Sequence, residues 1–399
     1  MNENTLSYGQ FPPESNAPAT RTYEHCKTWV EQGVEVTVIT GAPNFPHGKV
    51  YKGYSNKIYS IEYVDGIKVI RVWTFIAANK GFLKRIIDFI SFMISAFIAG
   101  LFVKTDLIIA TSPQFFTAVA GRWLAFWKRK KWVMEVRDLW PESIKAVGAM
   151  DRNIAIRFFE YLEHRMYKNA YKIVSVTDSF KRYIIADHNI PSSRIAVVKN
   201  GINTSMFSPI TKSTSLIKEL GLENKFIIGY IGTHGMAHKL DFILQCADKV
   251  KDESVHFLFV GAGAEKDNLL KLKENLGLKN VSLLPSVQKK QVKEYLSIID
   301  VGLVNLRKSD TFKSVLPSKI FELAAMHKPI LLGVEGEAKE LVEQYNVGLS
   351  FDPENETEFL RAIERLKNSD LDRWEFSRLV ADFDRVDLAK KMLEFLKED

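Results

Sequence analysis

Lys319 and Glu322 lie three residues apart in the segment LPSKIFELAAMHKPI, residues 316–330. Pro317 suits the first position of a helix, where its missing N–H leaves no hydrogen bond unmade. A helix N-terminus presents free N–H groups and a partial positive charge, which together bind anions such as phosphate. Lys319 would add a full charge there, and Glu322 could accept hydrogen bonds from sugar hydroxyls. The alternative is a surface ion pair worth about 0.2–0.5 kcal/mol, and the local pattern alone favours that alternative.

A second candidate is the segment YIGTHGMAHKLD, residues 230–241, which reads as a strand ending at Gly232, a loop, and a helix opening near Lys239. Glycine lets backbone N–H groups approach a phosphate closely. The signal is weak, because many strand–helix turns look like this. Residues 260–269, VGAGAEKDNL, lack the last glycine of a dinucleotide fingerprint and predict an ordinary turn near the same ligand cleft.

A third candidate is Asp138, which follows Arg137 in the segment EVRDLWPESI, residues 135–144. At the carboxyl end of a strand, its carboxylate could orient or deprotonate an acceptor hydroxyl. The equally weighted alternative is a local Arg–Asp pair covered by Trp140. No metal site is expected, since His234 and His238 lack a nearby set of carboxylate ligands. No Gly-x-Ser-x-Gly motif is present, which argues against a serine hydrolase.

Short β-branched runs alternate with helical patterns along the whole chain and restart near residue 226, which predicts an α/β protein with two doubly wound, Rossmann-like domains facing across a cleft. Expected strands of the first domain are 34–40, 67–73, 106–111, 132–136 and 172–176, with helices at 20–32, 82–103, 115–127 and 152–169. Expected strands of the second are 226–232, 256–263, 281–285, 301–306, 329–334 and 348–351. A linker is expected at 200–215, and the domain boundaries at 1–205, 206–380 and 381–399, the last a helix that crosses back to the first domain.

Charge is unevenly distributed. Residues 1–205 carry 27 Lys/Arg and 17 Asp/Glu, a net charge of +10, whereas the whole chain has +7. A basic first half favours an anionic partner, either nucleic acid or a membrane surface. Two cysteines far apart in the sequence fit a reducing cytoplasm, and the polar first ten residues do not resemble a signal peptide.

Two segments favour a membrane surface over nucleic acid, for which no motif is visible. Residues 89–103 form an uncharged run too short to span a bilayer, read either as a buried helix or as a helix in the membrane interface. Residues 122–132, RWLAFWKRKKW, combine tryptophans with basic residues, as a headgroup layer would require, or form a solvated basic loop. The candidate membrane residues are Trp123, Trp127, Lys128, Arg129, Lys130 and Lys131.

Taken together, several segments resemble GT-B glycosyltransferases of family 4, especially a bacterial surface-polysaccharide subgroup related to N-acetyl-L-fucosamine transferases. The resemblance covers nearly the whole chain. Its segments are 11–24, 40–54, 79–85, 135–144, 199–207, 232–241 and 316–330. It implies a sugar nucleotide held by the second domain and a final helix, 386–399, that returns to the first.

The resemblance also implies roles for individual residues. Glu322 matches a ribose-binding glutamate, and Ser318 with Lys319 matches the diphosphate-binding start of that helix. Gly232 and Thr233 match the loop beside the diphosphate, so that backbone N–H groups at 232–233 and 317–319 would hold the phosphates. Asp138 matches a residue that contacts acceptor or sugar.

The sequence departs from the family pattern in two places. Ser314 stands where the first glutamate of the Glu-x7-Glu motif is usual, and His238-Lys239 stands where Lys-Gly is usual. The cation that meets the second phosphate is therefore left open, with Arg307 and Lys313 as candidates.

The resulting prediction is a retaining, metal-independent hexosyltransferase that uses a UDP-sugar and needs no cofactor. Its catalytic residues would be Asp138, Lys319 and Glu322. Its partners would be the UDP-sugar, a polyprenyl-diphosphate-linked acceptor and the inner leaflet, with no nucleic acid, which makes it a cytoplasmic peripheral protein. The alternatives are a UDP-sugar 2-epimerase of similar fold and a non-catalytic assembly scaffold.

Overall fold

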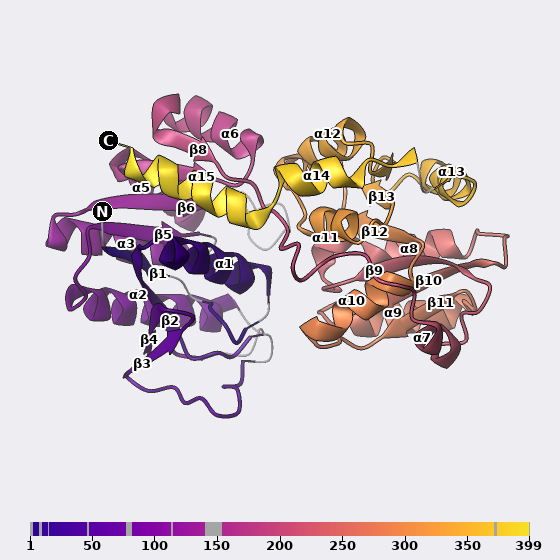
Figure 1. Ribbon diagram of the computed structural model, residues 1–399, viewed down its shortest axis with the longest axis horizontal. Helices are drawn as coiled ribbons and strands as arrows, with labels where there is room; N and C mark the ends of the chain where they lie inside the picture. The colour runs from indigo at the N-terminus through magenta and orange to yellow at the C-terminus, as the bar shows by residue number, and fades with distance from the viewer. Residues whose placement is uncertain are drawn as a thin grey trace. The chain divides into compact units, whose positions relative to one another are not determined.

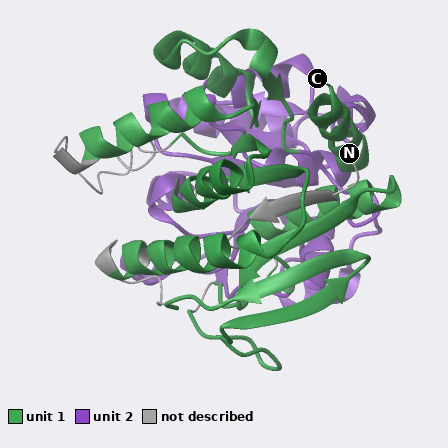
Figure 2. Cartoon of the chain, turned by 90° about the vertical axis from the view of Figure 1, so that its left-hand side faces the viewer, with its two compact units in different colours: residues 1–200, 385–399 green, residues 201–384 purple. Residues whose placement is uncertain are grey.

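The computed structural model describes residues 3–7, 10–14, 16–45, 48–76, 82–112, 115–139, 154–370 and 373–398. The chain forms two compact units, both of α/β type, shown in different colours in Figure 2. Unit 1 contains residues 1–200 and 385–399, and unit 2 contains residues 201–384. The chain therefore changes unit at 200–201 and again at 384–385, where the sequence suggested 205–206 and 380–381.

Unit 1 is built on an eight-stranded sheet with the order β3-β4-β2-β1-β5-β6-β7-β8. Its strands are β1 (Glu3–Ser7), β2 (Glu35–Gly41), β3 (Tyr59–Val64), β4 (Ile67–Val72), β5 (Leu107–Thr111), β6 (Lys131–Val136), β7 (Lys172–Ser175) and β8 (Ile195–Val197). These described strands pair in parallel, except that β3 and β4 are antiparallel.

Helices cover both faces of this sheet (Figure 1). They are α1 (Ala17–Glu31), α2 (Phe82–Leu101), α3 (Phe115–Lys128), α5 (Ile154–Asn169), α6 (Asp178–His188) and α15 (Arg385–Lys397). Strand β5 shows why both faces are filled: Ile109 packs in the cluster of α1 and α15, whereas Ile108 packs in the cluster of α3. Successive side chains of a strand point to opposite faces, so an unbroken apolar strand needs cover on both sides.

Three features of unit 1 differ from the expectation. The pair β3–β4 is a hairpin that the sequence analysis missed, although Asp65-Gly66 adopts the positive φ angles typical of its tight turn. Strand β8 was also missed, and it is only three residues long. The short polar β1, which is not among the expected strands, lies inside the sheet between β2 and β5.

Unit 2 has a six-stranded parallel sheet with the order β11-β10-β9-β12-β13-β14. Its strands are β9 (Phe226–Ile231), β10 (Val255–Val260), β11 (Val281–Leu284), β12 (Val301–Asn305), β13 (Ile330–Gly333) and β14 (Gly348–Ser350). Its helices are α7 (Thr214–Glu219), α8 (Leu240–Ala247), α9 (Lys266–Leu276), α10 (Lys289–Ile298), α11 (Lys319–Ala325), α12 (Glu337–Gln344), α13 (Glu356–Lys367) and α14 (Phe376–Asp382). The strand order reverses between β9 and β12, and ligands bind at such a switch point.

Cationic side chains cap the carboxyl ends of four helices. Each donates hydrogen bonds to the last carbonyl groups of the helix, where the helix dipole favours positive charge. The cations are Lys128 for α2, Arg194 for α5, Lys328 for α10 and Lys172 for α15. Lys172 makes two such bonds, of 2.6 Å each, to the carbonyls of Phe395 and Glu398.

Helix α15 is thereby fixed to unit 1, where it lies beside α1 in Figure 1. Trp29 Nε1 on α1 donates to the Ala389 carbonyl at 2.8 Å, and Met392 is buried in the same cluster. The final helix therefore belongs to the core of unit 1 despite its distance along the chain.

We expect Lys172→Met to weaken the docking of α15 by about 1–3 kcal/mol, because two carbonyl groups lose a charged donor. Hydrogen exchange of the α15 amides measures this loss. Lys390→Met is the matched control, since Lys390 is exposed on the same helix and, within the described part of the chain, pairs with nearby Asp387. Equal exchange rates in the two variants would contradict the capping role.

Candidate functional site

The ammonium group of Lys319 lies at the carboxyl end of strand β9. Its Nζ is 3.1 Å from the Tyr230 hydroxyl and 4.4 Å from the centre of the Tyr230 ring. The Tyr230 hydroxyl in turn donates to the Thr233 carbonyl at 2.8 Å, which fixes it as a neutral partner. Burial lowers the pKa of Lys319 to about 8, although the charge of Glu322 acts to raise it. Lys319 and Glu322 therefore do not form the solvated surface ion pair that the local sequence favoured.

Gly232 permits this placement. Its φ angle is +153°, in a region that favours glycine, and an added Cβ would lie 2.4 Å from Lys319 Cε and 2.6 Å from Nζ. Any side chain at this position would displace the ammonium group. The pattern that suggested a phosphate loop thus reflects a close approach between the loop after β9 and the helix α11.

Gly261 and Gly263, which follow the neighbouring strand β10, pack closely against the loop after β9. A Cβ on Gly261 would lie 1.8 Å from the Gly232 carbonyl oxygen, and one on Gly263 would lie 2.3 Å from that of His234. The His234 N–H donates to the Ala262 carbonyl at 2.9 Å. The sequence suggested an ordinary turn here, and the structure shows that this turn holds the candidate site in place.

The backbone donors differ in part from those expected at 232–233 and 317–319. The Gly232 N–H already donates to Val260, and Pro317 has no N–H. Helix α11 begins at Lys319, two residues later than expected, with Ser318 as its N-cap. Among the described residues, the N–H groups of Thr233, Ser318 and Lys319 have no acceptor.

Glu322 lies one turn after Lys319 on the same side of α11. Both line a small pocket with Ile231 of β9 and Leu296 of α10. Strand β9 and helix α11 thus bring together four residues that the sequence singled out, Gly232, Ser318, Lys319 and Glu322. Tyr230 was missed; its position two residues before the loop glycine, on a buried strand, gave no sign that its hydroxyl would face the lysine.

At the departures from the family pattern, three side chains have partners within their own segments. Lys239 adopts φ +48°, as a glycine in that place would, and its ammonium group pairs with Asp241 at 2.6 Å. Lys313 is exposed and pairs with Asp310 at 2.7 Å. Ser314 donates its hydroxyl to the Thr311 carbonyl at 2.9 Å, a bond within its own turn.

Arg307 follows β12, the strand beside β9, and its N–H donates to the Ala237 carbonyl at 2.8 Å. Its guanidinium has no partner among the described residues. His238 also faces this edge, with its ring centre 5.8 Å from that of Tyr230. Burial, and then the charge of Lys319, lower the pKa of His238 to about 3, so the imidazole is neutral at pH 7.

Asp138 lies in unit 1, two residues after β6, and is partly buried. Its backbone carbonyl is 3.4 Å from the Ser112 hydroxyl, and residues 140–144 of the predicted motif lie outside the described residues. Within β6, the buried Glu135 accepts hydrogen bonds from Arg21 and from Thr111. Although burial acts to raise the pKa of Glu135, the charge of Arg21 keeps it below its usual value.

The basic, tryptophan-rich segment 122–132 was expected to be exposed, and only part of it is. Trp123 and Trp127 are exposed, but Trp132 is buried and its Nε1 donates to the Asn169 carbonyl at 3.0 Å. Three of the lysines have partners within the chain. Lys128 caps α2, Lys130 pairs with Asp106, and Lys131 lies over the Tyr171 ring. Arg129 is exposed, with φ +52°.

Within the described ranges, no group of three or more His, Cys, Asp or Glu side chains is arranged to hold a metal ion. None of the described helices combines the length and apolar character that a bilayer crossing requires.

The chain matches two protein families, one after the other along the sequence. Residues 18–206 match the family described as Glycosyltransferase Family 4, and residues 212–378 match the family described as Glycosyl transferases group 1. The colanic acid biosynthesis glycosyl transferase WcaI of Escherichia coli K12 is 26% identical over 364 residues, 88% of each chain. The glycosyltransferase WbjE of Pseudomonas aeruginosa is 26% identical over 247 residues, 60% of this chain and 61% of WbjE.

A solved structure of Anabaena HepE in complex with UDP has a TM-score of 0.70 at 15% identity and covers 99% of both chains. This likeness shows the fold. The chain belongs to the GT-B glycosyltransferases, with a family 4 unit followed by a group 1 unit. It is an enzyme of the hexosyltransferase class, as the sequence predicted.

We expect the ammonium group of Lys319 to titrate with a midpoint near pH 8, because burial disfavours its charged form. The Glu322→Gln variant should lower this midpoint, since it removes the charge that raises it. The measurement is NMR of reductively ¹³C-methylated protein, with the Lys319 signal assigned by its loss in Lys319→Arg. A titration midpoint near pH 10.5 would contradict the burial of the Lys319 ammonium group.

Proposed function

We propose that this glycosyltransferase transfers a sugar from a UDP-sugar to a polyprenyl-diphosphate-linked acceptor during bacterial surface-polysaccharide synthesis, with retention of configuration and without a metal ion. The observation that carries the proposal is the Lys319 ammonium group, held at the end of β9 against the neutral Tyr230 hydroxyl and the bare backbone of Gly232. A partly desolvated cation whose near contacts include uncharged groups is suited to a diphosphate.

The chemistry follows from the charge that develops on the leaving group. As the bond from the sugar to the diphosphate breaks, negative charge grows on the released UDP. The N–H groups of Thr233, Ser318 and Lys319 and the Lys319 ammonium group are fixed beforehand and would stabilise that charge without reorganisation. Glu322 would accept hydrogen bonds from the ribose hydroxyls. Arg307, at the adjacent strand end, would meet the second phosphate.

The acceptor is assigned to unit 1. Asp138, at the carboxyl end of β6, would accept a hydrogen bond from the attacking hydroxyl. Its backbone carbonyl lies 3.4 Å from the Ser112 hydroxyl. The names of the relatives support the pathway, because WcaI is named for colanic acid biosynthesis. The HepE complex supports UDP as the nucleotide. N-acetyl-L-fucosamine is the candidate sugar, on the resemblance alone.

An apolar outer surface on unit 1 supports docking at the inner leaflet of the cell membrane. Helix α2 buries one side, including Phe92 and Ala96, but leaves apolar residues exposed on the other. The edge strand β3 contributes exposed side chains on the same face, because they lie opposite β4 residues that pack under α2. The exposed residues of this surface are Tyr59, Ile61, Tyr63, Ile87, Ile94, Ile98, Leu101, Trp123, Phe126 and Trp127.

We expect Lys319→Ala to lower the transfer rate by about 100-fold or more, because one fixed charge on the leaving group is lost. Glu322→Ala should weaken UDP binding by about 10- to 100-fold. The assay is mass spectrometry of a UDP-sugar panel with a synthetic polyprenyl-diphosphate sugar. Lys313→Ala, a change of an exposed lysine six residues earlier, is the control.

Wild-type turnover in purified, folded Lys319→Ala would overturn the diphosphate assignment. A UDP-sugar that changes configuration at constant mass without an acceptor, as seen by NMR of the product, would instead indicate the epimerase.

UDP affinity should fall as the pH rises above about 8. The free protein then has an uncharged Lys319, which must take up a proton when the diphosphate binds, so affinity drops up to about tenfold per pH unit. Three neighbouring groups do not titrate in this window, because burial lowers the pKa values of His234 and His238 to about 4 and about 3 and raises the pKa of Tyr230. Calorimetry between pH 7 and 9.5 tests this, and Lys319→Arg should remove the dependence.

A further inference from the structure

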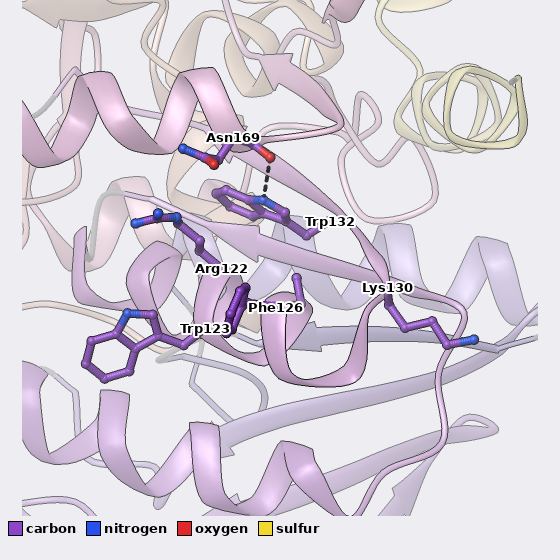
Figure 3. A pocket seen from close by; sticks show the side chains of 7 residues that line it. Arg122, Trp123, Phe126, Lys130, Trp132 and Asn169 are labelled. Atoms are coloured by element: carbon purple, nitrogen blue, oxygen red, sulfur yellow. Dashed lines mark hydrogen bonds between the residues drawn. The ribbon is translucent and has the colours of Figure 1, made fainter.

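We propose that an open pocket on unit 1, between α3, the start of β6 and the end of α5, binds the head-group phosphate of an anionic phospholipid. This inference rests on the proposed membrane docking of unit 1 and gives it a specific lipid contact. The pocket has a volume of about 400 Å³, within the usual range for small-molecule sites. Its lining residues, most of them labelled in Figure 3, are Arg122, Trp123, Ala125, Phe126, Lys130, Trp132 and Asn169.

Aromatic rings form the apolar part of the pocket. Phe126 is 78% exposed and Trp123 is 43% exposed, unusual values for such large apolar side chains. The Trp123 ring nevertheless has a fixed edge contact with Phe97 of α2, at 6.0 Å between ring centres. The buried Trp132 forms the rigid base, because its Nε1 donates to the Asn169 carbonyl.

The charge of the pocket comes from Arg122, which the sequence analysis did not single out. Its side chain is partly buried, and among the described residues its guanidinium has no hydrogen bond or ion pair. Lys128, by contrast, caps α2. The guanidinium presents paired N–H donors that match phosphate oxygens, and it stacks on aromatic rings.

The surroundings are positive. Residues 115–134 contain five basic residues and no acidic one. The acidic neighbour is Asp106, which is 3.4 Å from Lys130 in an exposed pair and is therefore screened by solvent. Figure 3 shows the Arg122 side chain beside the aromatic rings and the Lys130 side chain pointing away from them, so an anion that enters the pocket meets the guanidinium of Arg122.

A phospholipid fits better than a free phosphate because the pocket opens beside apolar surface. Trp123 connects it to α2 through Phe97, and exposed Ile98 and Leu101 lie at the same end of that helix. Phe102, directly after α2, is 84% exposed. Acyl chains of a lipid would cover these side chains, whereas a free phosphate would leave them in water.

The test is co-sedimentation of the full chain with vesicles of phosphatidylcholine alone or with 30% phosphatidylglycerol, without any UDP-sugar. We expect the wild type to prefer the anionic vesicles, and Arg122→Gln to weaken that binding about five- to tenfold. Arg165→Gln is the matched control, an exposed arginine on α5 that lies over the Tyr161 ring, and it should change binding less than twofold. Phe126→Ser should weaken binding to both vesicle types.

Three results would overturn the proposal. These are equal binding of Arg122→Gln and Arg165→Gln, no preference of the wild type for anionic vesicles, and competition by millimolar inorganic phosphate at constant ionic strength, which would indicate a free-phosphate site. Circular dichroism confirms that the variants are folded. The proposed transferase function is tested separately, because transfer to a water-soluble acceptor fragment needs no vesicle and vesicle binding needs no UDP-sugar.

Discussion

The site in unit 2 depends on a cation kept partly out of water. An ammonium group loses hydration energy when it is buried, and here the contacts at its tip are a phenol hydroxyl, an aromatic ring and a glycine backbone. Glu322 moderates the cost through its charge, but the pKa of Lys319 still falls to about 8. A diphosphate that binds beside such a cation gains more electrostatic stabilisation than it would beside a hydrated surface lysine. The surrounding backbone is shaped to hold it, since Gly232 gives it room and Gly261 gives room to the Gly232 carbonyl.

The two ends of the unit 1 sheet carry arginines in different environments. At the carboxyl end, Arg21 is buried with Glu135 and donates to the carbonyls of Val198 and Lys199, where the chain leaves the unit. That charge is satisfied and serves the fold. At the amino end, Arg122 stands beside exposed aromatic rings without a partner among the described residues. Arg21 is therefore a structural arginine, whereas Arg122 is available to a ligand. Arg21 is fully buried and Arg122 is partly buried.

Much of the fold could be predicted because long apolar strands and amphipathic helices repeat their pattern over many residues. Strands β5 and β10 are buried along their whole length, and the composition of such strands is distinctive. Strand β8 was missed because three residues are too few to show a strand pattern of apolar side chains. Strand β3 was missed because its exposed positions carry apolar side chains, whereas the exposed side of an edge strand is expected to be polar. The basic neighbours of Trp132 suggested a position at the surface, whereas β6 is buried at each position from Trp132 onward because both faces of the sheet are covered.

The sequence by itself determined the α/β class, the two-part organisation and the candidate residues Gly232, Thr233, Ser318, Lys319 and Glu322, because their types and the neighbouring strand and helix patterns are local properties of the chain. Only the tertiary structure decided how these residues act together. The approach of Lys319 to Tyr230 joins positions 89 residues apart. Among the described residues Arg122 has no partner, whereas Lys128 and Lys130 find theirs on distant segments. Burial and partner choice are set by packing between distant segments, and a sequence pattern records neither.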